Sequence, residues 1–185
     1  MRATQALWAA WFVYWWWASK NVKQAQQAET TASRGLHLAL LAFAFLILFS
    51  DAFRIGLMGR RLWPESPTLS GAGLGMTAAG LLFTIWARVH LGRYWSGEVQ
   101  IKEGHRLIMT GPYALARHPI YTGFLLAILG SAVSLGEGRG LVIMAATLAA
   151  FWRKVRIEEA VLSEEFGGEY AAYRGRTKAL IPFLL

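Results

Sequence analysis

Long apolar runs alternate with polar segments along the chain, and this pattern predicts helices that cross a membrane. A spanning helix needs roughly 20 mainly apolar residues. Five segments approach that length: 3–19, 35–57, 69–91, 120–135 and 140–152. Only residues 136–139 separate the last two, so these two are expected to form a helical hairpin. The sequence therefore predicts an all-α, polytopic membrane helix bundle with about five transmembrane helices.

The pattern also predicts a single membrane domain over residues 1–185, because this length suits one domain and is short for two. Residues 1–91 hold three of the expected helices. Residues 92–185 begin with a long polar segment, continue through the hairpin and end in a charged, amphipathic tail. We expect this second half to carry the chemistry.

Two short motifs lie within the apolar segments. Gly71 and Gly75 have the GxxxG spacing, which predicts a close approach between two membrane helices. Asp51 and Arg54 are three residues apart, so on a helix they can form an ion pair near the end of the second segment. The glycine motif is interpreted as a packing feature, and the charged motif as an ion pair near the helix end, with a buried polar site as its alternative.

Composition supports the membrane assignment. Apolar residues make up 55% of the chain, and the formal net charge is +8. That charge suits either nucleic acid or anionic lipid, and the long apolar runs favour lipid. The basic residues do not alternate with aromatic residues along a soluble surface, so nucleic-acid binding is not expected. The absence of Cys excludes disulfides, Cys-ligated zinc and thiol nucleophiles.

The distribution of Lys and Arg predicts an orientation, because cytoplasmic loops of membrane proteins are enriched in these residues. With five spans, the linker 20–34, the segment 92–119 and the tail share one side of the membrane. That side carries Lys20, Lys23, Arg34, Arg93, Lys102, Arg106, Arg117 and most basic residues of the tail, against Arg2, Arg60, Arg61 and Arg139 opposite. We therefore expect the N-terminus outside and the polar segments in the cytoplasm.

Residues 103–123 are the first candidate for chemistry. They combine two His, two Arg, two Tyr, two Pro and three Gly. Glycines and prolines favour non-helical backbone, which at membrane depth occurs only where it is buried in protein or lines a wet cavity. This segment is therefore expected to form part of a binding site. His105 and His118 lack a third ligand at useful spacing, so a metal site is not expected.

Glu158 and Glu159 are the second candidate. Adjacent carboxylates on a helix point about 100° apart, so we expect that they do not face one ligand equally. Alternatively, both form ion pairs on an exposed helix face, Lys154 with Glu158 and Arg156 with Glu159. The spacing alone leaves both interpretations open.

These residues resemble the superfamily of isoprenylcysteine carboxyl methyltransferases and phospholipid methyltransferases. The resemblance rests on the segments 111–113, 117–123 and 158–162, in that order and at that spacing. Residues 91–96 and 166–170 support it, together with Tyr173, Arg176 and Pro182. It covers about 90 residues, from Leu91 to the last residue.

The resemblance implies an all-helical membrane enzyme that transfers a methyl group from S-adenosylmethionine to a lipophilic or membrane-embedded acceptor. The implied cofactor contacts are His105, Leu107, Gly111, Tyr113, Arg117, His118, Pro119, Tyr121, Glu158 and Glu159. Arg117, Arg176 and Glu159 form the candidate catalytic set, with the two arginines holding an anionic group of the acceptor. The nucleophile, whether carboxylate, amine or thiol, stays open.

Two alternatives are considered. Sterol-type reductases, which use NADPH, have an Arg-His-x-Asn-Tyr pattern at the corresponding turn, whereas this chain has Arg-His-Pro-Ile-Tyr at 117–121. A non-enzymatic membrane scaffold would have no need of the residues at 117–119 and 158–159. The expected partners are a lipophilic methyl acceptor and membrane lipids, with no metal and no nucleic acid.

Overall fold

The computed structural model describes residues 2–20, 31–92, 95 and 107–181. The described residues form helices and no β-strand, which confirms the all-α prediction. The helices are α1 (Arg2–Ser19), α2 (Thr31–Phe49), the short 3₁₀ helix η1 (Asp51–Phe53), α3 (Gly56–Gly59), α4 (Pro67–Leu91), α5 (Pro112–Leu115), α6 (Pro119–Leu135) and α7 (Arg139–Arg176).

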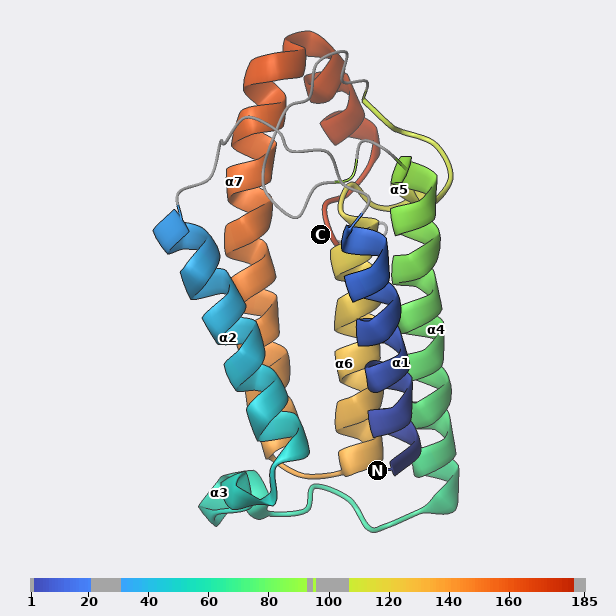
Figure 1. Cartoon of the computed structure of the whole chain (residues 1–185), viewed down its shortest axis with the longest axis vertical. Helices are drawn as coiled ribbons and strands as arrows, with labels where there is room; N and C mark the ends of the chain where they lie inside the picture. The colour runs from blue at the N-terminus through green and yellow to red at the C-terminus, as the bar shows by residue number, and fades with distance from the viewer. Residues whose placement is uncertain (1, 21–30, 93–94, 96–106, 182–185) are drawn as a thin grey trace.

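The long helices run alternately up and down the molecule (Figure 1). α4 packs most extensively on α6, and α1 packs on α4. α2 packs on α7, which also contacts α6. The bundle therefore has two parts: α1, α4 and α6 on one side, and α2 with α7 on the other (Figure 1).

Small residues bring α4 and α6 together. A Cβ added to Gly80 would lie 2.4 Å from the carbonyl oxygen of Gly123, and one added to Gly73 would lie 2.5 Å from that of Gly130. Gly71 and Gly75 have no atom within 4 Å of an added Cβ, so the prediction that they mediate helix packing is wrong. Gly73, on the contact face, is two residues from Gly71 and two from Gly75. Consecutive helix residues lie about 100° apart, so Gly71 and Gly75 lie about 200° around the helix from the contact face.

The second apolar segment is helical over a shorter range than the predicted 35–57. α2 ends at Phe49, and Asp51–Phe53 form η1. The Arg139 guanidinium explains this end, since its Nη1 donates to the carbonyl oxygens of Ile47, at 3.1 Å, and Ser50, at 2.6 Å. A buried cation thus satisfies terminal carbonyls that the helix itself leaves unpaired.

The predicted pair of Asp51 and Arg54 belongs to a larger ion-pair cluster. The Arg54 Nη1 lies 3.9 Å from Asp51 Oδ1, and its Nη2 lies 3.0 Å from Glu137 Oε1. Glu137 Oε2 lies 2.8 Å from the Nε of Arg139, and both of these side chains are almost fully buried. The cluster joins the end of α2 to the loop between α6 and α7.

α7 continues the last apolar segment directly into the charged one. It spans 38 residues, with a break at Gly167, whose φ of 47° lies in the left-handed region. The residues before the break form a helix roughly 40 Å long at 1.5 Å per residue. Glu158 and Glu159 therefore lie on the same rigid helix as the apolar residues 140–152, beyond their end.

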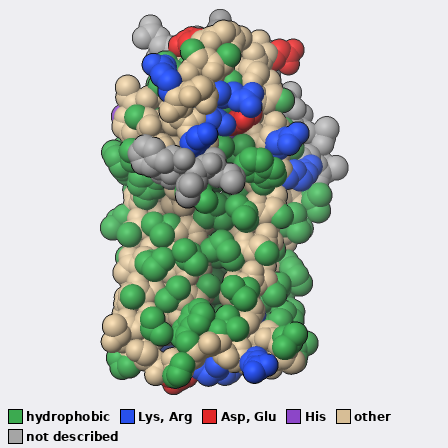
Figure 2. All heavy atoms as spheres, turned by 180° about the vertical axis from the view of Figure 1, so that it is seen from behind, with side chains coloured by type: hydrophobic (Ala, Val, Ile, Leu, Met, Phe, Trp, Pro, Cys, Tyr) green, Lys and Arg blue, Asp and Glu red, His purple; other side chains and the backbone are tan. Residues whose placement is uncertain are grey.

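The face of the molecule that Figure 2 shows is apolar around its middle, with Lys and Arg near both ends. Exposed large side chains include Val13, Leu57, Leu82, Val89 and Leu141. Among the described residues, one helix, Pro67–Leu91, is long and apolar enough to cross a membrane. The apolar helices Gly35–Phe49 and Pro119–Leu135 are shorter. An apolar helical bundle is thus observed, whereas the predicted five spans are not confirmed.

Candidate functional site

The site is built around the turn between α5 and α6. Gly111, with a φ of 59°, precedes α5, and Ala116 ends that helix in an extended conformation. His118 caps the start of α6 with non-helical backbone angles, and Pro119 occupies the first turn, where its missing N–H costs no hydrogen bond. The predicted non-helical backbone at Arg117 and His118 is therefore observed.

The segment after α7 folds back over this turn. The backbone N–H of Arg117 donates to Lys178 O at 2.8 Å, and that of His118 donates to Ala179 O at 3.0 Å. The Thr122 hydroxyl donates to Leu180 O at 2.5 Å. Residues 178 and 179 thus pair with the two backbone N–H groups that precede α6, and residue 180 pairs with a side chain in the first turn of α6.

Arg117 and Glu159 form the central ion pair. The Nε and Nη2 atoms of Arg117 lie 2.7 and 2.6 Å from Glu159 Oε1, and both side chains are largely buried. The remaining nitrogen, Nη1, donates to the carbonyl oxygens of Arg174 and Thr177. All three guanidinium nitrogens of Arg117 are therefore engaged within the protein.

His118 lies between the two consecutive carboxylates. Its Nδ1 lies 3.1 Å from Glu158 Oε2, and its Nε2 lies 3.4 Å from Glu159 Oε1. The expectation that the two glutamates do not face one ligand equally concerns a bound ligand and stays a prediction; towards His118, the two carboxylates approach different ring nitrogens. The two ring nitrogens of one imidazole point in different directions, and two long side chains can reach them from adjacent positions on α7.

The electrostatics follow from this geometry. Burial alone would lower the pKa of His118, but hydrogen bonds to Glu158 and Glu159 outweigh it and raise the pKa above 6.5. For Glu159, burial favours a higher pKa, and this effect is outweighed by hydrogen bonds from His118 and Arg117, which lower the pKa to about 2. The site therefore stabilises an ionised Glu159 beside a protonated His118.

Glu158 completes the group from the side of α6. The Tyr121 hydroxyl donates to Glu158 Oε1 at 2.6 Å, and the Tyr121 ring stacks 5.7 Å from the His118 ring. The Glu158 side chain is 22% exposed, against 13% for Glu159, so it is the more accessible of the two carboxylates. The contacts of Glu158 and Glu159 with Tyr121, His118 and Arg117 favour a site over the alternative of ion pairs on an exposed helix face.

A second group lies beside the turn, around Tyr113. The Tyr173 hydroxyl donates to Tyr113 O at 2.6 Å, which ties the end of α7 to α5. Burial raises the pKa of both tyrosines, so both hydroxyls stay protonated. The His90 ring, in the last turn of α4, lies 6.4 Å from the Tyr113 ring and 2.9 Å from the Thr110 hydroxyl.

The structure brings five of the expected residues into one cluster: Arg117, His118, Tyr121, Glu158 and Glu159. Gly111 precedes α5, Tyr113 lies within it and Pro119 begins α6, so these three lie in or next to the turn, whereas Leu107 is half-buried in the segment before Gly111. His105 lies outside the described residues. The Nη2 of the exposed Arg176 lies 3.8 Å from Met109 Sδ rather than beside Glu159.

Sequence reasoning missed Arg174, whose Nε lies 3.6 Å from Glu159 Oε2, and the pairing of residues 177–180. No sequence signal distinguishes Arg174 from Arg176, because the direction of this segment is set by the break at Gly167. No cluster of three or more potential metal ligands is found among the described residues.

The arrangement provides two kinds of polar group at one end of an apolar bundle. The carboxylates of Glu158 and Glu159 can accept hydrogen bonds from hydroxyl or ammonium groups. The exposed guanidinium groups of Arg174 and Arg176 can bind a carboxylate or phosphate. Such a site suits a charged, water-soluble ligand that meets an apolar one.

Comparison with known proteins agrees with this chemistry. The model of the isoprenylcysteine carboxyl methyltransferase family matches residues 73–164. The chain is 31% identical over 151 residues to a probable protein-S-isoprenylcysteine O-methyltransferase of Oryza sativa subsp. indica, a match covering 78% of this chain and 79% of that protein. It is 34% identical over 128 residues to the protein-S-isoprenylcysteine O-methyltransferase of Rattus norvegicus, over 66% of this chain and 45% of the rat protein.

An apolar helical bundle with this site and these relatives is a membrane methyltransferase. The chain belongs to the isoprenylcysteine carboxyl methyltransferase family. The predicted resemblance to the family is therefore confirmed, with a family match over residues 73–164 that begins before Leu91, within α4, and ends before the supporting residues of the tail. The relatives favour neither the reductase nor the scaffold alternative.

Proposed function

We propose that this protein transfers a methyl group from S-adenosylmethionine to the carboxylate of a lipophilic, isoprenylcysteine-type acceptor. The observation that carries the proposal is the convergence of Glu158, Glu159 and Arg117 on His118 at one end of an apolar bundle. The acceptor class follows the relatives, which are named for S-isoprenylcysteine.

The residues present fit this methyl donor. S-adenosylmethionine carries hydroxyl and ammonium groups that donate hydrogen bonds, and the partly exposed Glu158 carboxylate is an acceptor for them. It also carries a carboxylate, for which the exposed guanidinium of Arg174 is a suitable partner. The expected contacts Leu107, Gly111, Tyr113 and Pro119 are proposed to line the same site from α5 and its flanks.

The main task of the protein in this methyl transfer is to align the methyl donor with the acceptor carboxylate. When bound, S-adenosylmethionine supplies a methyl group on a sulfonium, whose sulfur keeps the electron pair when the carbon–sulfur bond breaks. An acceptor carboxylate forms the new carbon–oxygen bond without losing a proton, so no general base is required. The buried cluster and the apolar bundle would exclude water and hold the reacting groups in line.

The two candidate catalytic arginines have different roles in this proposal. All three nitrogens of Arg117 are engaged by Glu159 and by carbonyl oxygens, so Arg117 positions Glu159. The guanidinium of Arg176 is exposed, so in this proposal Arg176 binds the anionic group of the acceptor. Glu159 holds Arg117 and His118 in place and presents a fixed negative charge to the donor.

We further propose that α1, α2, α4, α6 and α7 each cross the membrane, with the site on the cytoplasmic side. Their alternating directions bring the ends that carry the site to one end of the molecule (Figure 1). The bias of Lys and Arg towards the linker 20–34, the segment 92–119 and the tail supports a cytoplasmic position for that end.

The test compares Glu158→Gln and Glu159→Gln with Glu164→Gln, which removes an exposed carboxylate from the same helix. S-adenosylmethionine binding to purified protein in detergent is measured by calorimetry, and methyl transfer is measured with N-acetyl-S-farnesylcysteine. Each site variant should weaken binding by about tenfold or more, which corresponds to about 1.4 kcal/mol. Glu164→Gln should match wild type.

Two results would overturn the proposal. The first is wild-type protein that binds no S-adenosylmethionine at millimolar concentration. The second is normal affinity in both site variants. Transfer to an amine or a thiol but not to the farnesylcysteine carboxylate would replace the acceptor class and leave the donor site in place.

A further inference from the structure

A short segment with exposed apolar side chains lies beside the foot of α2, at the end of the bundle opposite the charged site (Figure 1). It consists of η1, α3 and the residues that flank them, and we call residues 51–65 the α3 loop. Ile55, Leu57 and Leu62 are all exposed, and Leu57 is 79% exposed. A group of exposed large apolar side chains marks a surface that contacts another molecule or a membrane.

Backbone contacts hold the α3 loop in place, so its exposed side chains have a defined position. Leu62 N donates to Gly136 O at 2.8 Å, and Gly138 N donates to Arg60 O at 2.9 Å. A Cβ added to Gly138 would collide with the carbonyl oxygen of Leu57, so the two backbones are in close contact. The loop is therefore packed on the turn between α6 and α7, with its apolar side chains directed away from that contact.

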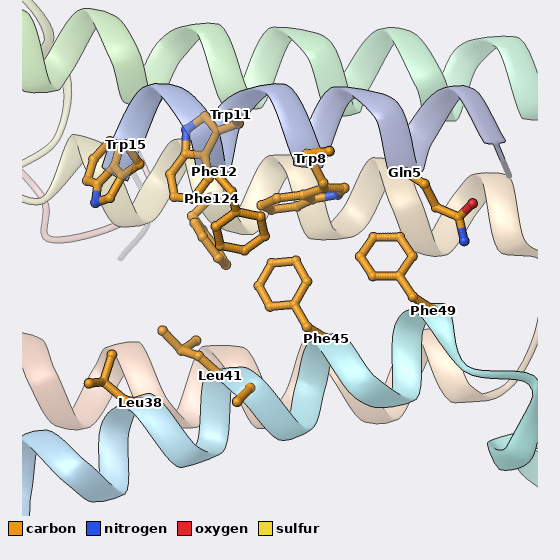
Figure 3. A pocket seen from close by; sticks show the side chains of 12 residues that line it. Gln5, Trp8, Trp11, Phe12, Trp15, Leu38, Leu41, Phe45, Phe49 and Phe124 are labelled. Carbon is orange, nitrogen blue, oxygen red and sulfur yellow. The ribbon is translucent and has the colours of Figure 1, made fainter. Parts of the chain in front are cut away.

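α2, which precedes the loop, has two different apolar faces. Figure 3 shows Leu41, Phe45 and Phe49 of α2 pointing towards α1 across an apolar cavity of about 650 Å³. Phe43 and Leu46 do not line this cavity and are exposed. The first face belongs to the interior of the bundle, and the second faces outwards.

A ring contact joins the outward face of α2 to the α3 loop. The ring centroids of Phe43 and Phe53 lie 6.0 Å apart, and Ile55 follows two residues after Phe53. The exposed apolar surface therefore continues from α2 onto the loop. If α2 crosses a membrane, lipid contacts its outward face, and the continuous surface of the loop meets the same lipid.

Arg60 differs from the other two arginines of the loop. Arg54 Nη2 lies 3.0 Å from Glu137 Oε1, and Arg61 Nη1 lies 2.8 Å from Glu65 Oε1. The exposed side chain of Arg60 has no hydrogen bond or ion pair with any residue that the structure describes. The loop contains three Arg and two acidic residues, so its net charge is +1.

An unpaired cation beside exposed apolar side chains suits the surface of a phospholipid bilayer. Apolar side chains enter the region just below the headgroups, and a guanidinium binds phosphate oxygens above them. The hydrocarbon part of an Arg side chain can lie along lipid while its charged end reaches the phosphate. A zwitterionic headgroup would bring a second cation close to Arg60, so an anionic headgroup is the better partner.

We propose that the α3 loop is a membrane-surface anchor. Ile55, Leu57 and Leu62 insert below the headgroups of the leaflet at this end of the bundle, and Arg60 binds the phosphate of an anionic phospholipid there. This inference goes beyond methyl transfer and rests only on the proposal that the bundle crosses a membrane. It assigns a partner to a loop that lies outside the residues matched by the family model.

The first test measures the depth of single nitroxide labels, which the absence of Cys in the chain makes possible. Ile55→Cys and Leu57→Cys are compared with Glu65→Cys, a position in the same loop whose side chain is 82% exposed. The proteins are reconstituted at low density in vesicles of phosphatidylcholine and phosphatidylglycerol. Oxygen should reach the first two labels, and a water-soluble nickel complex should reach only the label of Glu65→Cys.

Leu82→Cys, at an exposed position of α4, tests the membrane crossing separately. A label that is shielded from nickel in Leu82→Cys but accessible in both Ile55→Cys and Leu57→Cys would overturn the anchor and leave the crossing standing. Accessible labels in all three variants would refute both. Shielding of the loop labels only at high protein density would indicate contact with a second copy of this chain, and would overturn the anchor.

The second test identifies the lipid. A bimane fluorophore on Leu57→Cys is quenched by phospholipids that carry a nitroxide near the carbonyl end of one acyl chain. Phosphatidylglycerol should quench at about fivefold lower mole fraction than phosphatidylcholine, which corresponds to about 1 kcal/mol for one arginine at an anionic surface. Arg60→Gln should remove this preference, whereas Arg60→Lys, which keeps the charge, should retain most of it.

Three results would overturn the lipid assignment. The first is equal quenching by the two lipids when Arg60 is present. The second is an unchanged preference for phosphatidylglycerol in Arg60→Gln, because another cation would then bind the headgroup. The third is loss of the preference on addition of millimolar sn-glycerol 3-phosphate, which would identify a soluble phosphate ester as the ligand.

Discussion

His118 takes its properties from two carboxylates that are neighbours in the sequence. Glu158 and Glu159 approach its two ring nitrogens, at 3.1 and 3.4 Å. Arg117 and Arg174 add positive charge around Glu159. Each charge in the cluster therefore has an opposite partner, which buried charges require.

The first prediction is a pH dependence of stability. The folded pKa of His118 is raised above 6.5, so its stabilisation is complete below pH 6.5 and is lost as pH rises through the folded pKa. The folded pKa of Glu159 is lowered from 4.5 to about 2, so its stabilisation is present above pH 4.5 and is lost as pH falls towards 2. The unfolding temperature in detergent should be highest between these two ranges.

The control for this prediction is His118→Gln, which cannot titrate. Its unfolding temperature should be lower than that of wild type at acidic pH and should approach it as the pH rises. A difference between the two curves that stays constant from acidic to alkaline pH would show that Glu158 and Glu159 do not raise the pKa of His118.

At the scale of elements, the bundle depends on two different contacts. α4 and α6 meet through glycines, which allow the backbones to approach closely. α2 meets α7 through the buried Arg139, which caps carbonyl oxygens at the end of α2. The first contact is steric and the second is electrostatic.

The second prediction concerns the steric contact. Gly80→Ala would place a Cβ 2.4 Å from Gly123 O and 2.5 Å from Ala127 N, both backbone atoms that must move. We expect a loss of about 1–3 kcal/mol of stability. Gly75→Ala, on the open face of the same helix, should be neutral or raise stability by about 0.5–1 kcal/mol. Thermal unfolding followed by Trp fluorescence measures both, and equal losses would contradict the α4–α6 packing.

The third prediction concerns the electrostatic contact. Arg139→Met removes the buried one of the two arginine partners of the Glu137 carboxylate and uncaps α2, and should cost about 3 kcal/mol. S-adenosylmethionine affinity of the folded fraction should not change, because this cluster lies at the opposite end of the bundle from Glu159 (Figure 1). Arg60→Met, at an exposed position nearby, should leave stability near wild type. A loss of S-adenosylmethionine affinity in folded Arg139→Met, absent in Arg60→Met, would contradict this prediction, because it would show that the Arg139 cluster affects the cofactor site.

At the scale of the whole molecule, an apolar band separates two charged ends (Figure 2). The end with Glu137 carries fewer Lys and Arg residues than the end with Glu159, where α7 alone contributes Arg153, Lys154, Arg156, Arg174 and Arg176. In a bilayer this asymmetry favours one orientation, with the site in the cytoplasm.

The fourth prediction tests that orientation. The chain has no Cys, so Glu65→Cys and Glu169→Cys each introduce a single thiol, at opposite ends of the molecule. A membrane-impermeant maleimide should label Glu65→Cys in intact cells. It should label Glu169→Cys only after the membrane is permeabilised. The reverse pattern would place the site outside, away from a cytoplasmic cofactor.

The sequence by itself determined the helical class, the hairpin at 136–139, the non-helical turn at Arg117 and His118, and the family. These features depend on local properties: runs of apolar residues, Pro and Gly positions, and motif order. The alternation of polar and apolar segments also singled out the two polar stretches of the C-terminal half whose side chains meet in the charged cluster.

Only the tertiary structure decided which faces meet. It selected Gly73 and Gly80 instead of Gly71 and Gly75, and it brought Arg174 rather than Arg176 to Glu159. It also brought apolar side chains of α1 and α2 together with Phe124 of α6 around one cavity. The physical reason is that lipid and protein interiors are both apolar, so hydropathy cannot tell a helix face that contacts lipid from one that contacts another helix.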